Sequence, residues 1–351
     1  MSTTTLTVTS PPNYLSTEQQ LAEITFVEPD ASCDPWDCDY FSIPRPLTIA
    51  CEKLPLHNLR SEIFSVNSPY GLEKSGFTAV KHRSAFYDAP YSINSFMDER
   101  LVGDVYIPET EELVKSVTGA KNVYSISAGI RLHPSSPLMK TVAENLANPP
   151  TEPERCGVKF DREAIDLTKA YIGGVKEDQK VGPARTMHID FSPRGAAKQL
   201  RHLRRDIREQ AEDIIKIEDE MKEGDVYEGR RYAVYSIWRP LRTVKKDPIA
   251  VCDGRSINPE TDLIEHVYKN LGEDGDYLTE VHMLQSQNAA SQKWYYIKEQ
   301  QPDEVMFIQF FDSHAKKEGR VVGVPHGSPV LIGNEETELR NSVEIRCLAF
   351  W

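Results

Sequence analysis

The chain lacks the features that would place it in a membrane or on the secretory route. It has no run of 18 apolar residues, so the sequence predicts no transmembrane helix. Its first 20 residues are rich in Ser, Thr, Pro and Gln and have no basic start followed by an apolar core, which argues against a secretory signal. We therefore expect residues 1–20 to form a disordered tail and the protein to be cytoplasmic.

Positive charge is also scarce. The sequence has 41 Lys and Arg against 54 Asp and Glu, a formal net charge of −13. Nucleic-acid binding needs clustered Lys and Arg facing phosphates, so we expect no nucleic-acid partner. The one basic cluster, 201–205, lies in a predicted helix that is also rich in acidic residues, and we interpret it as a solvated helix face. The expected partner is a small-molecule substrate, and homodimer formation stays open.

Cysteine is too sparse to indicate a disulfide framework. Six cysteines occur in 351 residues, at positions 33, 38, 51, 156, 252 and 347. The spacing of Cys33 and Cys38 does not suggest zinc. Without a secretory signal, reduced thiols are the default. We interpret all six as structural or incidental.

What the sequence does have, in its second half, is a series of short strands. Apolar and β-branched runs predict strands at 232–238, 249–252, 277–284, 293–297, 305–311, 321–322 and 342–350. Seven short strands separated by turns favour a jelly roll or sandwich. Ahead of them, apolar residues recur at spacings of three, four or seven from Ser192 to Gly224, which predicts an amphipathic helix of roughly 25 residues.

His188 and Asp190 are the most informative pair of residues. They lie two apart in a predicted strand, 185–192, so their side chains point to the same face. Two His and one carboxylate on one side of a metal make the facial triad of non-haem iron sites, which leaves positions open for a co-substrate and O2. Alone, the pair could equally be a hydrogen-bonded His and carboxylate in a sheet. It gains weight only with a second His.

His326, in 324–329, is the favoured second histidine. His314 competes with it, but His314 lies in a polar, Lys-rich stretch typical of an exposed turn. The sequence therefore predicts a metal site made of His188, Asp190 and His326.

The C-terminal strand carries two arginines on one face. With a period of two, one face is apolar and packs outward, and the other lines the interior with Arg340, Ser342, Glu344, Arg346, Leu348 and Phe350. A buried guanidinium needs an anionic partner, and its planar fork fits a carboxylate. Arg340 or Arg346 could hold such a carboxylate, with Ser342 as a second donor. The Arg-x-Ser pattern favours Arg340 and leaves Arg346 to pair with Glu344.

The order His-x-Asp, distal His and Arg-x-Ser resembles the iron(II)/2-oxoglutarate-dependent oxygenases with a double-stranded β-helix (jelly-roll) core. More narrowly, the sequence resembles the group that includes gibberellin desaturases, AsaB-type hydroxylase/desaturases and cephem-methoxylase-like proteins. The matching blocks span roughly 180–351, about half the chain, and are 187–192, 236–241, 248–253, 293–296, 303–307, 311–313, 325–326 and 340–346.

This resemblance implies a mainly β protein with flanking helices that binds Fe(II) and uses 2-oxoglutarate and O2. The reaction would hydroxylate, desaturate or oxidatively cyclise a specialised metabolite or an amino-acid-derived molecule, with release of succinate and CO2. The distal carboxylate of 2-oxoglutarate would lie on Arg340 or Arg346, with Ser342. Candidate substrate residues are Leu348 and Phe350, which continue the inward face, and Trp238 and Arg239 from one matching block.

We expect one domain over 21–351, in which 21–180 supports and covers the barrel mouth and 181–351 holds the metal. Three other interpretations stay open: a cupin-like metal protein (zinc hydrolase or small-molecule binder), a non-catalytic binding protein, and an iron oxidase that takes all its electrons from the substrate. Activity without 2-oxoglutarate would favour the first or the third, and loss of a metal ligand would favour the second.

Overall fold

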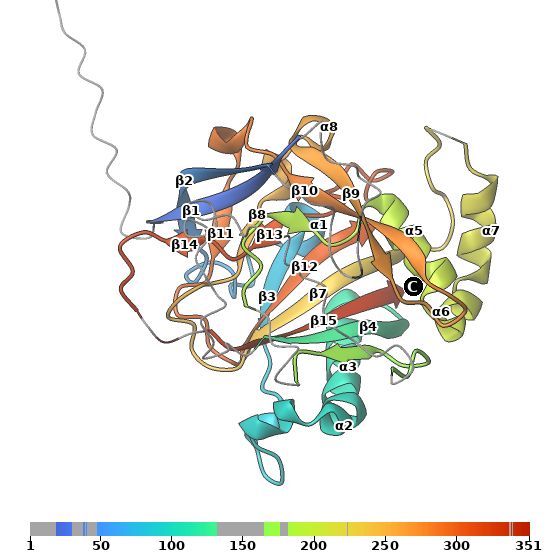
Figure 1. Ribbon diagram of the computed structural model, residues 1–351, viewed down its shortest axis with the longest axis horizontal. Coiled ribbons are helices and arrows are strands. Elements are labelled where there is room, and N and C mark those ends of the chain that lie inside the picture. Colours follow the sequence, from blue (N-terminus) through green and yellow to red (C-terminus); the bar gives the residue numbers. More distant parts are fainter. Residues whose placement is uncertain are drawn as a thin grey trace, which may run out of the picture.

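The computed structural model describes residues 19–29, 38, 40, 48–131, 165–175, 182–222, 224–336, 338 and 340–351. Within these residues two β-sheets form the core (Figure 1). The larger sheet has nine strands in the order β14-β1-β2-β11-β8-β13-β6-β10-β9. The smaller has six, in the order β3-β12-β7-β15-β4-β5.

The strands of the larger sheet are β1 (Gln19–Glu28), β2 (Thr48–Asn58), β6 (His188–Ile189), β8 (Ala250–Cys252), β9 (Leu263–Asn270), β10 (Tyr277–Leu284), β11 (Trp294–Tyr296), β13 (His326–Gly327) and β14 (Val330–Leu331). Those of the smaller sheet are β3 (Phe77–Lys81), β4 (Asn122–Arg131), β5 (Tyr171–Gly173), β7 (Tyr232–Pro240), β12 (Glu304–Asp312) and β15 (Ser342–Phe350).

The described helices are mostly short. They are α1 (Leu72–Ser75), α2 (Glu99–Leu101), α3 (Ile107–Thr118), α5 (Pro193–His202), α6 (Arg205–Gln210), α7 (Glu212–Glu220) and α8 (Pro259–Asp262). Single turns of 3-10 or π helix are η1 (Ala85–Tyr87), η2 (Ile93–Met97), η3 (Val102–Tyr106), η6 (Gly254–Ser256) and η7 (Ala289–Ser291). Of these helices, none combines the length and the hydropathy that a membrane span requires.

The smaller sheet separates two hydrophobic clusters, because side chains alternate along each strand. The inner cluster joins both sheets and the helices α5–α7, and includes Ile189, Val251, Trp238, Ile308 and Leu348. The outer cluster packs the opposite face of the same strands against α3 and η3, and includes Leu113, Val114, Ile237, Val343 and Ile345. Figure 1 shows α3 below the smaller sheet and α5–α7 at the right of the molecule. The two faces predicted for 342–350 are therefore correct.

The single long helix predicted after Ser192 is wrong. The helix does begin there, since Ser192 Oγ accepts a hydrogen bond from the Gly195 amide at 3.1 Å. It is then broken at Arg204, whose backbone is extended (φ −147°, ψ 152°). Arg204 is buried and donates to the Ser125 carbonyl at 2.8 Å, so tertiary contacts override the helical periodicity.

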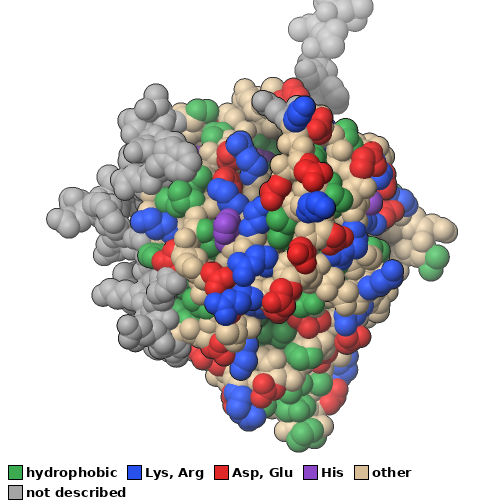
Figure 2. All heavy atoms as spheres, turned by 90° about the vertical axis from the view of Figure 1, so that its right-hand side faces the viewer, with side chains coloured by type: hydrophobic (Ala, Val, Ile, Leu, Met, Phe, Trp, Pro, Cys, Tyr) green, Lys and Arg blue, Asp and Glu red, His purple; other side chains and the backbone are tan. Residues whose placement is uncertain are grey.

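The basic cluster 201–205 makes no positive patch. Arg201 pairs with Glu218 and Asp219, and Arg205 pairs with Asp274. Figure 2 shows acidic and basic side chains interspersed on the face that carries α5–α7. The prediction that 201–205 is a solvated helix face is wrong for Arg204, because its side chain is buried.

Other boundaries differ in detail from the predictions. β1 begins at Gln19, so residues 19 and 20, the last two of the predicted tail, belong to a strand. Residues 1–18 of that tail lie outside the described residues. Residues 321–322 are not a strand, whereas β9 was not predicted. Cys51, Cys252 and Cys347 are free thiols, and Cys33 and Cys156 lie outside the described residues.

Candidate metal centre

Two short segments of backbone bring the predicted ligands together. β6 and β13 are neighbours in the larger sheet, and His326 is the register partner of His188. Asp190 follows β6 directly and shares the face of His188. One ligand atom from each of the three residues lies within 4.8 Å of the other two. His188, Asp190 and His326, hereafter the triad, are thus assembled as predicted.

His314 is elsewhere. Its Nε2 lies 2.8 Å from the Gly229 carbonyl oxygen and its Nδ1 lies 3.7 Å from Glu318. The structure therefore brings His326, and not His314, to the pair of His188 and Asp190.

The orientation of His188 suits a metal ligand. Its Nδ1 lies 2.8 Å from the Thr186 carbonyl oxygen, a contact that requires a proton on Nδ1. Nε2 then faces Asp190 Oδ1 at 3.1 Å. Two ligands bound at about 2.1 Å and at right angles lie about 3.0 Å apart, so this spacing fits a shared ion. Burial lowers the pKa of His188, but the hydrogen bond and charge of Asp190 raise it more, to above its ordinary value. A metal ion would replace the proton shared by these two groups.

His326 is held as a neutral imidazole. Its ring stacks on Phe310 with 5.1 Å between centroids, and lies 4.5 Å from the ring of His188. Burial, followed by repulsion from His188, lowers the pKa of His326 to about 4. Its Nδ1 is buried and has no hydrogen-bond partner in the described residues. A neutral imidazole with an unsatisfied nitrogen is the form that binds metals.

The two carboxylate oxygens of Asp190 have different partners. Oδ1 faces His188, while Oδ2 accepts a hydrogen bond from Arg346 Nε at 2.5 Å. Arg346 Nη2 also lies 3.1 Å from Glu344, which accepts a 2.6 Å bond from Ser236. Burial raises the pKa of Asp190, but Arg346 and His188 lower it well below its usual range. Asp190 is therefore an ionised ligand whose outer oxygen is fixed by Arg346.

Arg340 and Ser342, hereafter the distal pocket, have unmet hydrogen-bonding capacity. Arg340 is 5% exposed; its Nη1 donates to the Asp247 carbonyl at 2.8 Å, whereas its Nε is buried without a partner. Ser342 is 1% exposed and its Oγ also has no partner in the described residues. Because buried donors are normally satisfied, an anion such as the distal carboxylate of 2-oxoglutarate fits this pocket. Arg346, already paired with two carboxylates, has no such deficit.

The four predicted substrate residues fall into two groups. Trp238 lies on the inner face and its ring packs 5.2 Å below the Arg340 guanidinium, so it supports the distal pocket. Leu348 and Phe350 are also inward, but they are fully buried in the inner cluster. Their contact with a substrate stays a prediction.

Arg239 is not brought to the site, which corrects its assignment as a substrate residue. As the neighbour of Trp238 it must face the outer side of β7. There its Nε donates to the Tyr106 hydroxyl at 3.0 Å, and its Nη1 donates to the carbonyls of His82 and Pro302. Arg239 is a core residue of the outer face.

Two residues of the site carried no sequence signal. Gly129 lies on β4 opposite Glu344, and a Cβ there would lie 4.0 Å from Arg346 Nη1, an ordinary contact that places this position beside Arg346. Phe310 was predicted only as part of a strand. Neither belongs to a motif, because each acts through the register of strands distant in sequence.

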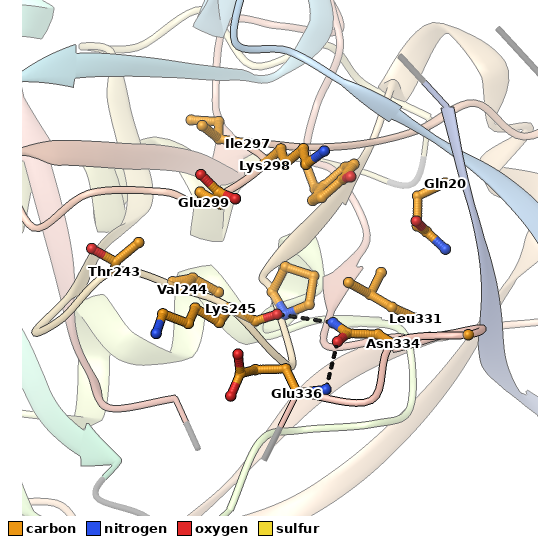
Figure 3. Close-up of a pocket in the computed structure, with 13 residues that line it drawn as sticks. Gln20, Thr243, Val244, Lys245, Ile297, Lys298, Glu299, Leu331, Asn334 and Glu336 are labelled. Atoms are coloured by element: carbon orange, nitrogen blue, oxygen red, sulfur yellow. Dashed lines mark hydrogen bonds between the residues drawn. The ribbon is translucent and has the colours of Figure 1, made fainter. Parts of the chain in front are cut away.

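A hollow of about 580 Å³ lies outside this centre (Figure 3). Its wall includes Gln20, Lys245, Leu331 and Asn334, and Asn334 Nδ2 donates to the Lys245 carbonyl at 2.9 Å. Pro248 also lines it, next to the Asp247 that accepts from Arg340. None of the triad or distal-pocket residues lines this hollow.

Comparisons with known proteins identify the family to which the chain belongs. A family model described as an oxidoreductase/YMDC permease-like domain matches residues 48–350. The gibberellin cluster GA4 desaturase of Gibberella fujikuroi is 36% identical over 295 residues, covering 81% of this chain and 84% of that protein. The alpha-ketoglutarate-dependent dioxygenase phiK of a fungal species is 27% identical over 280 residues, covering 80% and 79%.

Among solved structures, the iron and alpha-ketoglutarate-dependent endoperoxidase NvfI superposes with a TM-score of 0.61 at 23% identity, covering 95% of this chain and 99% of that one. This likeness confirms the jelly-roll core. The fold and the triad together define a non-haem iron oxygenase. The chain belongs to the family of Fe(II)/2-oxoglutarate-dependent oxygenases that includes gibberellin desaturases and AsaB-type hydroxylase/desaturases. The cofactors of this family are Fe(II), 2-oxoglutarate and O2.

Proposed function

We propose that this enzyme, in the cytoplasm, hydroxylates, desaturates or oxidatively cyclises a small specialised metabolite and converts 2-oxoglutarate to succinate and CO2. The relatives' names include a GA4 desaturase and hydroxylase/desaturases. The observation that carries the proposal is the unsatisfied distal pocket on the strand face that also carries Arg346, the partner of Asp190, since a dicarboxylate co-substrate would supply the missing acceptor.

The residues divide the work between binding and orientation. His188, Asp190 and His326 would hold the iron. Arg340 and Ser342 bind the distal carboxylate of 2-oxoglutarate, which orients its 2-oxo acid end towards the triad. Iron(II) bound here together with 2-oxoglutarate supplies activation of O2 for attack on a C–H bond. Arg346 keeps Asp190 ionised and fixed.

The apolar surroundings limit access of water. Phe310 covers one side of His326, and their rings stack. Excluding water from such a site prevents side reactions of the activated oxygen.

Anaerobic titration with Fe(II) and then 2-oxoglutarate tests the proposal. We expect the visible charge-transfer band of a 2-oxoglutarate chelate in the wild type. The band should be absent in His326→Ala, which lacks a ligand, and should need far more 2-oxoglutarate in Arg340→Met. A protein that binds zinc but gives no band with iron would support the cupin-like alternative, and turnover without 2-oxoglutarate would support the iron oxidase.

The reaction outcome needs a second measurement. Extracts containing candidate metabolites are incubated with the enzyme under O2, and the products are compared by mass. Gain of one oxygen atom indicates hydroxylation, and loss of two hydrogens indicates desaturation or ring closure. Succinate formed in equal amount to product would tie either outcome to 2-oxoglutarate.

A further inference from the structure

Arg131, the last residue of β4, faces the same interior as the triad. It is the register partner of Ser342, so its side chain starts beside the distal pocket. Gly129, two residues earlier, points towards Arg346, since a Cβ built there would lie 4.0 Å from Arg346 Nη1. Residues two apart on a strand share a face, so Arg131 points inward as well.

Arg131 has no anionic partner in the part of the chain that the structure describes. Its Nη1 donates to the Gly182 carbonyl at 2.7 Å. The nearest carboxylates on this side, Asp190 and Glu344, are both bound by Arg346. Burial lowers the pKa of Arg131 by more than the opposing charge of Glu344 raises it.

The charge of Arg131 also acts on Arg340 in the distal pocket. The causes that lower the pKa of Arg340 are burial first and then Arg131. Three guanidiniums, those of Arg131, Arg340 and Arg346, thus share the interior with the two carboxylates of Asp190 and Glu344. The Arg185–Asp247 pair nearby is neutral. One further negative charge between Arg131 and Arg340 would balance the group.

We propose that Arg131 is a second arginine for the distal carboxylate of 2-oxoglutarate, which lies between Arg131 and Arg340 with Ser342 as a neutral donor. This assignment rests on the proposed function. It commits to the co-substrate, and not to a carboxylate on the substrate, because the strand partner of Arg131 is Ser342 of the distal pocket. The consequence is strong selection for a dicarboxylate over a 2-oxo acid with one carboxylate.

The test compares 2-oxoglutarate with 2-oxobutyrate, which has the same 2-oxo acid end but no distal carboxylate. Both are titrated anaerobically into the Fe(II)-loaded wild type and Arg131→Met, and the chelate band gives each dissociation constant. We expect 2-oxoglutarate binding to weaken by roughly 10- to 100-fold in Arg131→Met, the loss typical of a hydrogen bond to a charged group. The binding of 2-oxobutyrate should be unchanged.

Matched controls separate this role from a general defect. Arg131→Lys keeps the charge but loses the fork, so its 2-oxoglutarate affinity should lie between those of the wild type and Arg131→Met. If Arg131→Met does not fold, Arg131→Lys carries the same comparison. Fe(II) affinity, measured by calorimetry without any 2-oxo acid, should stay at the wild-type value in both variants.

Two results would overturn the assignment. One is a folded Arg131→Met that binds 2-oxoglutarate as tightly as the wild type. The other is an equal loss for both 2-oxo acids, which would mean that Arg131 supports the metal or the fold. Absence of the band in the wild type would instead refute the proposed function itself, so the two failures are distinguishable.

Discussion

Replacing Arg346 by Met tests how far the metal centre depends on the outer oxygen of Asp190. In the native site Arg346 Nε holds Asp190 Oδ2 at 2.5 Å and Nη2 holds Glu344 at 3.1 Å. Loss of an outer partner of a metal ligand typically weakens metal binding about 10- to 100-fold, which is about 1.4–2.7 kcal/mol. Met has a similar length, so the cavity left behind is small.

One effect opposes this loss. Removing a guanidinium also removes repulsion on a bound dication, which alone would tighten binding. The same removal leaves Asp190 and Glu344 as two buried carboxylates facing each other, so proton uptake by one of them competes with the metal. We expect the loss of orientation and the competing proton to dominate, because both act directly on Asp190.

Anaerobic calorimetry with Fe(II), and with Mn(II) as a redox-stable substitute, measures the change. Arg340→Met is the matched control, since it should keep metal affinity and weaken only 2-oxoglutarate. Urea unfolding of the metal-free proteins should show a loss of about 3–5 kcal/mol in Arg346→Met, the usual cost of breaking a buried ion pair. Metal affinity equal to or tighter than that of the wild type, in a folded Arg346→Met, would refute the positioning role.

Arg239→Met should lower the unfolding free energy by about 3 kcal/mol through loss of its hydrogen bonds to Tyr106 and two carbonyls, yet leave the 2-oxoglutarate chelate band intact. Gly195→Ala should destabilise by about 1–3 kcal/mol in urea, because the new Cβ would lie 2.1 Å from the Glu280 carbonyl oxygen and push α5 off β10; wild-type stability would disprove this contact. Burial, then Arg194, lowers the pKa of His282 to about 4, so the unfolded state binds more protons and stability falls as the pH drops from about 6.5 towards 4. His282→Gln should remove at most about 2 kcal/mol of that loss at pH 5, measured as unfolding free energy against pH 7.5, and an unchanged pH dependence would contradict it.

Alternation along strands predicted much of the site from the sequence. It placed His188 with Asp190, and it assigned both faces of β15 correctly. The same rule should have separated Trp238 from Arg239, since adjacent residues of a strand cannot both point inward. The error came from treating the residues of the block 236–241 as one functional unit. Residues on one face of such a strand can pack in the core while those on the other face line the site.

Contacts between strands distant in sequence could not be predicted. The pairing of Arg346 with Asp190 depends on where β15 lies across the barrel from β6, which no local pattern encodes. Arg131 shows the same limit: Gly129 to Arg131 resembles no motif, and its relevance appears only through the register with Ser342. The helix predicted from periodicity is interrupted at Arg204. There the hydrogen bond from the buried guanidinium to the Ser125 carbonyl outweighs the small helix propensities of the neighbouring residues.

Three groups of residues with different surroundings follow one another along the inner face of the C-terminal segment. Arg340, two residues before the strand, and Ser342 at its start have donors without a partner in the described residues. In the middle, Arg346 pairs with both Glu344 and the metal ligand Asp190, and at the end Leu348 and Phe350 are fully buried. An arginine that already satisfies two carboxylates gains little from a third, and freeing it would expose both to an uncompensated burial cost. The existing partners of the two arginines therefore favour our proposal that Arg340, and not Arg346, binds the co-substrate. It follows that substitutions at the start of β15 should change 2-oxoglutarate affinity, and those in its middle metal affinity, so the two constants should respond independently.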